Sequence, residues 1–339
     1  MTGTKPFIAL LSRTGRALGL LRRISRRQII GVLAIGAFFW GAGDGRPHVA
    51  MGAAHRPKPW FDAKGAFVFP LAEGALPATR EQFNHSLTQA WKAHLRFPEG
   101  GDIIQTEGGR YPALGSLLIQ LSGGIVDTKR EAENNDPPLK PSGKVEGRVA
   151  VRQFDLDAQP LITDKAKMSV HIAATDARLD IEHDEHGRPM MMLADATEAS
   201  FQFEATNADM EKMLVQDLTL AGKKYGVKVK KATLKLTAVN NRSIDVDLHL
   251  STVVAFVPAG MRFEAHVEID NDMYARLSHL KCEGDEALGP LISGLIRPGL
   301  AKYEGKSRPV FSFPTGQLKL KDVTIQGGDD VKIGAKFSR

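Results

Sequence analysis

The stretch that decides the fold reads MRFEAHVEID at residues 261–270, where apolar and polar residues alternate one by one. Phe263, Ala265, Val267 and Ile269 would lie on one face of a strand, with the polar residues between them on the other. Such alternation is typical of a strand with one buried and one solvated face. We therefore predict a β-strand here and a sheet built around it.

Downstream of this strand the apolar residues recur three or four positions apart, which predicts an amphipathic helix. Its stripe consists of Leu288, Leu291, Ile292, Leu295, Ile296 and Leu300. Pro298 should kink this helix or end its regular part, and Gly305 is placed to terminate it. Alternation then resumes at Leu318 and slips by one residue near Asp322, which predicts a β-bulge.

Strands also dominate residues 145–256, with Val254 and Phe256 in the last of them and a turn at Asn240-Asn241. One helix interrupts them at about 207–225, with the stripe Met210, Met213, Leu214, Leu218 and Ala221. Two blocks, 203–214 and 267–277, look alike, and each resembles a strand that runs into a helix capped by Asn or Asp. This likeness predicts a weak internal repeat.

Residues 60–130 form an N-terminal helical or mixed extension. Thr79 and Gln82 have the spacing of a capping box at the start of a helix that ends before Pro98. The stripe of this helix is Phe83, Leu87, Trp91 and Leu95. The apolar residues from 103 to 126 fit a helix or a strand equally well, and a Pro-rich loop at 131–144 follows.

The N-terminal segment, residues 1–43, combines a basic region with the uncharged run IIGVLAIGAFFWGAG at 29–43. This run fits the hydrophobic part of a signal peptide, and Arg26-Arg27 resembles a twin-arginine export signal. A membrane anchor is the equally supported alternative. In both cases the bulk of the chain lies outside the cytoplasm, in the cell envelope or periplasm, after a linker at 44–59.

The net charge of +6 comes from this N-terminal segment. Residues 1–27 hold seven Lys or Arg and no acid, so the rest of the chain is close to neutral. Nucleic-acid binding therefore loses its main support. The lysines at 228, 230, 231, 235, 319 and 321 are interpreted as solvated surface, with contact to anionic lipid headgroups as the second interpretation.

No motif indicates catalysis, a cofactor or a metal, so we predict a protein that is not an enzyme. The best metal candidate is His183-Asp184-Glu185-His186, but it has the position of a polar hairpin tip where nothing orients ligands. Cys282, near Glu283 and Asp285, lacks the positive surroundings that make a reactive thiolate and is interpreted as a buried or inert thiol. A cleft that joined His249, His266 and Asp270 would be needed to revive an enzymatic hypothesis.

The second half of the chain, about residues 165–326, resembles bacterial members of the tubular lipid-binding (TULIP) superfamily, particularly exported LmeA-like phospholipid-binding proteins. The resemblance lies in 226–236, in 267–270, in the helix 288–300 and in 318–323. It implies an α+β fold in which a long curved antiparallel sheet wraps against amphipathic helices, with a groove for acyl chains. The lipid-binding-like domain would span residues 145–339.

These observations together predict non-catalytic binding of a phospholipid or similar amphiphile on the outer side of the cytoplasmic membrane, with lipid transfer as an extension of that role. The groove candidates are the apolar stripe positions Leu288, Leu291, Ile292, Leu295, Ile296, Leu300, Met210, Met213 and Leu214. The expected partners are an acyl-chain ligand and the membrane. The alternative is a structural protein of the envelope with a closed core and a protein partner.

Overall fold

The structure is a computed structural model. It describes residues 67–98, 100–126, 139, 141–163, 166–223, 227–254, 256–271, 274–309 and 318–339, without the side chains of 220–223, 295 and 308–309. The predicted anchor and linker, residues 1–59, lie outside this part. Within the described residues, no helix has the length and apolar character needed to cross a bilayer.

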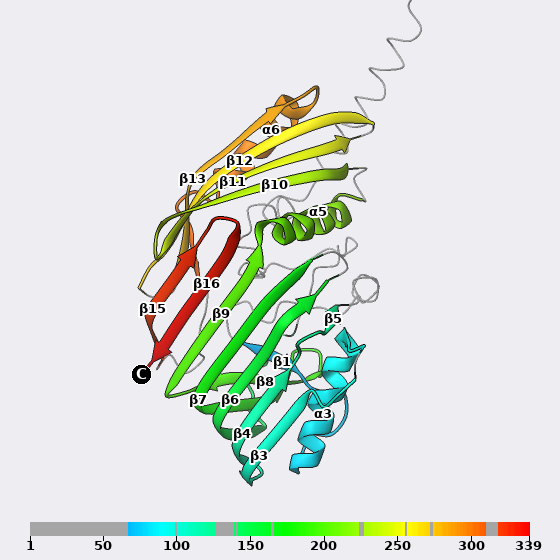
Figure 1. The fold of residues 1–339 in the computed structure, drawn as a ribbon, viewed down its shortest axis with the longest axis vertical. Coiled ribbons are helices and arrows are strands. Elements are labelled where there is room, and N and C mark those ends of the chain that lie inside the picture. The colour runs from blue at the N-terminus through cyan, green and yellow to red at the C-terminus, as the bar shows by residue number, and fades with distance from the viewer. Residues whose placement is uncertain are drawn as a thin grey trace, which may run out of the picture.

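Most of the described chain lies in two β-sheets (Figure 1). The larger has eleven strands, and its main order is β15-β16-β9-β7-β6-β4-β3. Its strands are β1 (Val68–Pro70), β2 (Leu95–Arg96), β3 (Ile104–Arg110), β4 (Ala113–Gln120), β5 (Ile125–Val126), β6 (Gly147–Ile162), β7 (Lys167–His183), β8 (Pro189–Asp195), β9 (Glu198–Thr206), β15 (Lys319–Gln326) and β16 (Asp330–Ser338).

The smaller sheet has five strands in the order of the sequence, and all its pairs are antiparallel. They are β10 (Val227–Asn240), β11 (Ser243–Val254), β12 (Val257–Ile269), β13 (Tyr274–Asp285) and β14 (Ser307–Pro309). The alternating stretch at 261–269 lies in β12, the central strand. Its predicted strand is confirmed.

The fold class predicted from the sequence is wrong. The described chain is mostly β-sheet, with no closed barrel, and its helices are short: α3 (Arg80–His94), α5 (Asn207–Lys223) and α6 (Gly289–Leu300). The sheet is also divided into two and is not purely antiparallel, because β4 and β5 pair with β6 in parallel. The protein is therefore not a single antiparallel sheet wrapped against helices.

The predicted wrapping of one sheet around the helices fails because α5 and α6 lie against edges of the smaller sheet. On α5, the Glu211 carboxylate accepts a hydrogen bond from the Leu234 N–H of β10 at 2.8 Å, and the Thr219 hydroxyl donates to the Val229 carbonyl at 3.3 Å. On α6, the Arg297 guanidinium donates to the Cys282 carbonyl of β13 at 2.8 Å. The two helices thus satisfy backbone groups that a bare edge would expose to another chain.

Backbone contact between glycines brings α6 close to β12 and β13. A Cβ added at Gly289 would lie 2.5 Å from the Gly260 carbonyl oxygen and 2.9 Å from the carbonyl carbon of Gly284. Both neighbours are backbone atoms in strands, so they have little room to yield. Gly294, on the same helix, has no atom within 4 Å of such a Cβ.

Gly289→Ala is therefore expected to lower the free energy of unfolding by about 1–3 kcal/mol, the usual cost of overpacking. Gly294→Ala should raise it by about 0.5–1 kcal/mol, because alanine loses less backbone entropy in a helix. Urea unfolding of both variants checks this pair. Equal effects of the two substitutions would show that α6 does not dock through its glycine contact.

Several local predictions are confirmed. Thr79 caps α3 by accepting the Gln82 N–H, and α5 and α6 fall on the predicted helical stretches. The register of β15 shifts between Leu320 and Asp322, where the bulge was predicted. The predicted repeat is wrong, because β12 turns into strand β13 where the second helix was expected.

The N-terminal extension is part of the larger sheet. Strands β3 and β4 extend it beyond β6, so the predicted boundary at 130–145 falls within one sheet. Phe67 packs on Phe201 of β9 at a ring distance of 6.2 Å, and Phe69 packs on Phe154 of β6 at 5.9 Å. Trp91 of α3 lies 6.5 Å from Phe69. This extension therefore covers part of one face of the sheet.

Candidate functional site

The face that β1 and α3 partly cover, called here the inner face, is apolar across the whole larger sheet. The strand registers align one side chain from each of seven strands into a single row. None of these side chains is more than 6% exposed. The row consists of Val323, Ala335, Phe201, Ile172, Leu156, Ile119 and Ile104.

The neighbouring row, one residue along each strand, points to the opposite face and contains no large apolar residue. Its members are Thr324, Gly334, Gln202, His171, Asp157 and Gln120. Within this row, His171 lies 3.8 Å from Asp157. Along these rows the larger sheet has one apolar and one polar face, as the period-2 pattern requires. At β1 and β8 the outer face also carries a small buried apolar cluster of Val68, Met190 and Met192.

The smaller sheet repeats this arrangement. Leu234, Leu248, Phe263 and Cys282 form a buried row across β10 to β13. The adjacent outward row is Lys235, Asp247, Glu264 and Lys281, in which Lys281 pairs with Glu264 at 3.2 Å. Inward positions in both sheets are thus uncharged, and this inner face is the best candidate for a ligand-binding surface.

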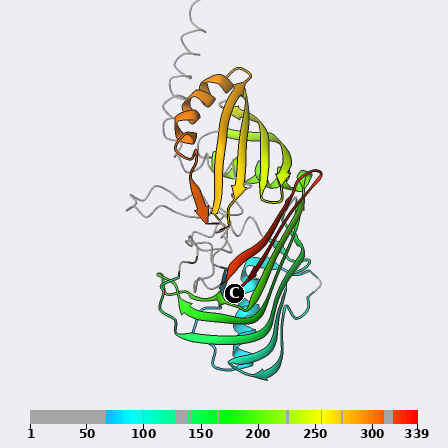
Figure 2. The same cartoon turned by 90° about the vertical axis from the view of Figure 1, so that its left-hand side faces the viewer.

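The two sheets meet at a seam formed by the β15–β16 turn and the β10–β11 hairpin. The Ile325 N–H of β15 donates to the Asn241 carbonyl of the β10–β11 turn at 3.0 Å, and Gly327 lies against the Leu236 carbonyl of β10. Figures 1 and 2 show that both sheets are curved and that α5 spans the space between β9 and β10. The inner faces therefore join into one apolar core cluster.

Helix α5 carries three of the predicted groove residues to this junction. Met210 and Leu214 are buried, and Met213 is partly buried. Asp217, one turn beyond Met213, keeps an accessible surface, but the surrounding protein desolvates its carboxyl and raises its pKa to about 6. Asp217 is nevertheless exposed, so its carboxyl is accessible to water at the surface of α5.

An acid with a raised pKa binds its proton more tightly in the folded state than in the unfolded state. Its contribution to folding stability is therefore fully present below the unfolded pKa of about 3.9 and is lost as the pH rises through the folded pKa of about 6. Asp217→Asn should therefore raise the melting temperature at pH 7.5 and leave it nearly unchanged at pH 4. Thermal unfolding followed by circular dichroism at both pH values tests this expectation.

Asp209 on the same helix is the matched control. Burial acts to raise its pKa, but hydrogen bonds from Lys212 and Thr206 outweigh it and leave the pKa below its ordinary value. Its stabilisation is present above about pH 3.9 and is lost as the pH falls. Asp209→Asn should lower the melting temperature at pH 7.5. A fall of the same size in Asp217→Asn would contradict the assignment.

The six candidates on α6 lie at the other edge of the smaller sheet. Ile292, Ile296 and Leu300 are buried against β12 and β13, and Leu288 is partly buried. Leu291 is 44% exposed, and the Leu295 side chain lies outside the described part. The α6 stripe thus packs on β12 and β13 while the α5 stripe packs near β10, and the buried residues of both belong to the same apolar core cluster.

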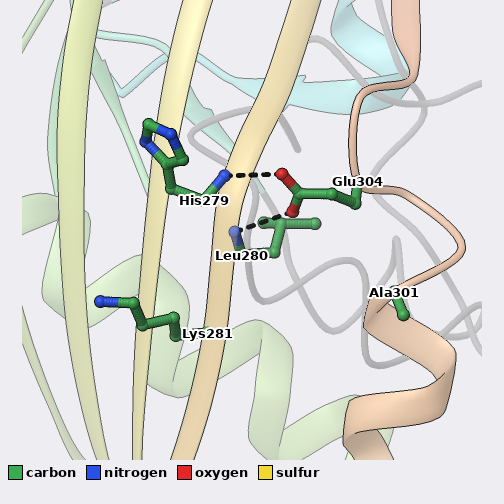
Figure 3. Close-up of a pocket in the computed structure, with 5 residues that line it drawn as sticks. All are labelled: His279, Leu280, Lys281, Ala301 and Glu304. Atoms are coloured by element: carbon green, nitrogen blue, oxygen red, sulfur yellow. Dashed lines mark hydrogen bonds between the residues drawn. The ribbon is translucent and has the colours of Figure 1, made fainter.

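Two hollows lie on the smaller sheet. One, of about 700 Å³, is an open depression beside α6, where Glu304 accepts hydrogen bonds from the N–H groups of His279 and Leu280 at 2.8 and 2.9 Å (Figure 3). The other, of about 260 Å³, lies on the outer face and includes His266, which contacts Asp245 at 2.7 Å. The first hollow is lined mainly by apolar surface but is open to solvent, and the second is mainly polar.

The residues proposed for metal or catalytic chemistry have structural contacts. Asp184 accepts two hydrogen bonds from the Arg188 side chain; burial acts to raise its pKa, but these and two backbone N–H donors leave it below its ordinary value. His249 contacts Asp285, and Asp270 accepts the Tyr274 N–H. Within the described residues, no three His, Cys, Asp or Glu side chains are grouped for a metal ion.

Cys282 lies on the inner face, where burial raises the pKa of its thiol to about 11. The thiol is therefore almost entirely protonated at neutral pH and a poor nucleophile. This placement agrees with its interpretation as an inert thiol.

Sequence reasoning missed most of the inner face because it followed the helical stripes. The inward residues of β9 and β16 were visible as alternation, at Phe201, Phe203, Ile333 and Phe337. Their assembly into rows depends on strand order and register, which the sequence does not display. The comparisons give no further guide: the chain matches no family model, no curated protein and no solved structure.

Proposed function

We propose that this protein binds a phospholipid or a similar amphiphile along its inner face, outside the cytoplasm, without catalysis. The observation that carries the proposal is the uncharged, continuous inner face, with apolar rows that cross seven strands of the larger sheet and four of the smaller. An acyl chain requires such a surface, since it offers no hydrogen bonds. The polar outer face keeps the protein in water while the chain is bound.

Burial of about 16 methylenes at roughly 0.8 kcal/mol each gives a gross gain on the order of 10 kcal/mol. Loss of rigid-body freedom and ordering of the chain reduce this gain. The surplus still suffices for a long-chain lipid and falls quickly for a shorter one. We therefore propose a ligand with at least one long acyl chain.

The place where the ligand enters is proposed to be the junction at α5. The two sheets share no strand pairing, and α5 connects β9 of the larger sheet to β10 of the smaller with Met210 and Met213 on it. Methionine side chains are flexible and adapt to differently shaped apolar partners. The helix-wrapped architecture implied by the resemblance to tubular lipid-binding proteins is not the one found. What this proposal retains from that resemblance is the binding of lipid on an apolar sheet face.

Native mass spectrometry tests the proposal. The full chain is purified and cleaved at a protease site engineered into the linker at 44–59, so that lipids held by the N-terminal segment are removed. The remaining domain should carry one phospholipid mass, and organic extraction identifies it. A bare mass that persists after incubation with liposomes would contradict the proposal.

One observation favours the second candidate, a structural protein with a closed core and a protein partner. Inner-face residues such as Phe203, Leu248 and Phe263 are no more than 4% exposed without any ligand. On that interpretation the rows are ordinary core, and the bare mass is the expected result. The two candidates therefore give opposite outcomes in the same experiment.

A further inference from the structure

Phe256 lies at the turn between β11 and β12, and its side chain is 98% exposed. Its backbone φ is +72°, in the left-handed region that favours glycine or asparagine. A phenylalanine here has a strained backbone, and its large apolar ring remains exposed and gains no hydrophobic stabilisation. Folding stability gives no reason for this residue, so its position indicates a contact outside the chain.

The surroundings of Phe256 are also apolar. No charged residue occurs from Leu250 to Met261. This uncharged stretch includes the turn of the β11–β12 hairpin. Val253 and Val257 are half-buried and Pro258 is exposed. We call the described residues of this turn, 253, 254 and 256–258, the hairpin tip.

Three lysines stand beside the hairpin tip. Lys228 of β10 pairs in register with Val253, and Lys231 pairs with Ser251, with Lys230 in the bulge between Val229 and Lys231. All three are exposed and form no ion pair with a described residue. This side of the hairpin tip is therefore positively charged and uncompensated.

The acids at this end of the sheet lie farther from the tip. Asp285 of β13 is in register with Gly260, three residues after Val257, and it contacts His249 at 3.3 Å. Glu286 follows it at the β13–α6 connection. The charge next to Phe256 is thus basic on the β10 side, whereas the acids flank the opposite side.

We propose that this end of the smaller sheet docks on an anionic lipid bilayer. Phe256 inserts among the lipid headgroups, and Lys228, Lys230 and Lys231 contact the lipid phosphates. An exposed aromatic ring beside lysines is the combination that binds the interface of an anionic membrane. The inference is independent of whether the inner face holds an acyl chain.

The opposite end of the same sheet supplies the contrast. Val239 of β10 is 54% exposed there, next to the Asn240-Asn241 turn. It is apolar and accessible, but it is a smaller residue without the three-lysine cluster. Docking through the hairpin tip therefore predicts lipid contact at residue 256 and none at residue 239.

Site-specific fluorescence in the full chain tests the proposal, because it reports which residue meets the lipid even if the N-terminal segment also binds membrane. Phe256→Cys and, separately, Val239→Cys are labelled with bimane, while Cys282 stays unlabelled because it is buried with a pKa of about 11. Each protein is reconstituted with vesicles of brominated phosphatidylcholine, with or without phosphatidylglycerol.

We expect quenching of the label at 256 on vesicles with phosphatidylglycerol and no quenching at 239. Neutralising the three lysines by Lys→Gln at 228, 230 and 231 should reduce the quenching at 256 to its level on neutral vesicles. The matched control, Lys319→Gln with Lys321→Gln on the exposed lysines of β15, should leave it unchanged.

An unquenched label at 256 would overturn the proposal and favour a protein partner for the tip. Equal quenching at 256 and 239 would also overturn it, because contact would not be specific to this end. If quenching at 256 were the same with and without phosphatidylglycerol, and the same with and without the three lysines, an anionic surface would not be the partner. Melting temperatures close to wild type show that each labelled variant is folded.

Discussion

The Phe263→Asp variant is expected to be largely unfolded at neutral pH. Phe263 is 1% exposed and lies between Leu248 and Cys282 in the inward row of the smaller sheet. Loss of a buried phenylalanine ring costs about 3–5 kcal/mol, and an unpaired buried carboxylate adds several more. Together these losses approach the 5–15 kcal/mol that typically stabilises a whole protein.

Thermal unfolding and limited proteolysis measure this effect, with Glu264→Ala as the control. Glu264 is the next residue on β12, but its side chain is 38% exposed and pairs with Lys281 at 3.2 Å on the outer face. Loss of such a surface ion pair costs no more than about 1 kcal/mol. If both variants melted within a few degrees of wild type, the inner face would not be a sealed apolar surface.

Gly327→Val should separate the two sheets. A Cβ at Gly327 would lie 2.6 Å from the carbonyl oxygen of Leu236 in β10, so the turn and the strand would have to move apart. That movement would break the nearby hydrogen bond between Ile325 and Asn241. The expected cost is about 1–3 kcal/mol from overpacking, with further loss if the seam opens.

Calorimetry distinguishes an opened seam from simple destabilisation. If the seam couples the two sheets, the single unfolding transition of wild type should divide into two in Gly327→Val. Gly334→Ala is the control, because a Cβ at Gly334 in β16 has no atom within 4 Å. A single transition at the wild-type temperature in Gly327→Val would contradict the seam.

Residue alternation was the reliable guide to this fold. It located β12 around Phe263, and the slip near Asp322 marked a real bulge in β15. Both features depend on which residues follow one another, and local sequence carries that information. The stripe of α6 was also visible, including Pro298 within it.

The role of the helices was not predictable in the same way. An apolar stripe shows that a helix packs on something, but the edge contacts of α5 come from its polar residues Glu211 and Thr219. Those residues look like ordinary surface in the sequence. The prediction of a sheet wrapped around helices failed because it considered the stripes alone.

Turns caused the remaining errors. Residues 270–274 were predicted to begin a helix, since Asp and Asn are also good helix caps, but they connect β12 to β13. Phe256 was placed inside a strand because it continues the apolar alternation after Val254, yet it lies at a turn with a positive φ. Of the proposed site, the buried positions on α5 and α6 were visible, whereas the rows and the hairpin tip required the structure.

Photo-crosslinking at paired positions tests the central claim, that the inner face holds an acyl chain, most directly. Benzoylphenylalanine replaces Phe203 or Phe263, which point inward, and in matched proteins Gln202 or Arg262, which point outward on the same strands. The full chains are irradiated in cells, purified and analysed by mass spectrometry. We predict phospholipid adducts at 203 and 263 and none at 202 and 262. Folded proteins without lipid adducts at the inward positions, or with adducts only at the outward ones, would contradict the account.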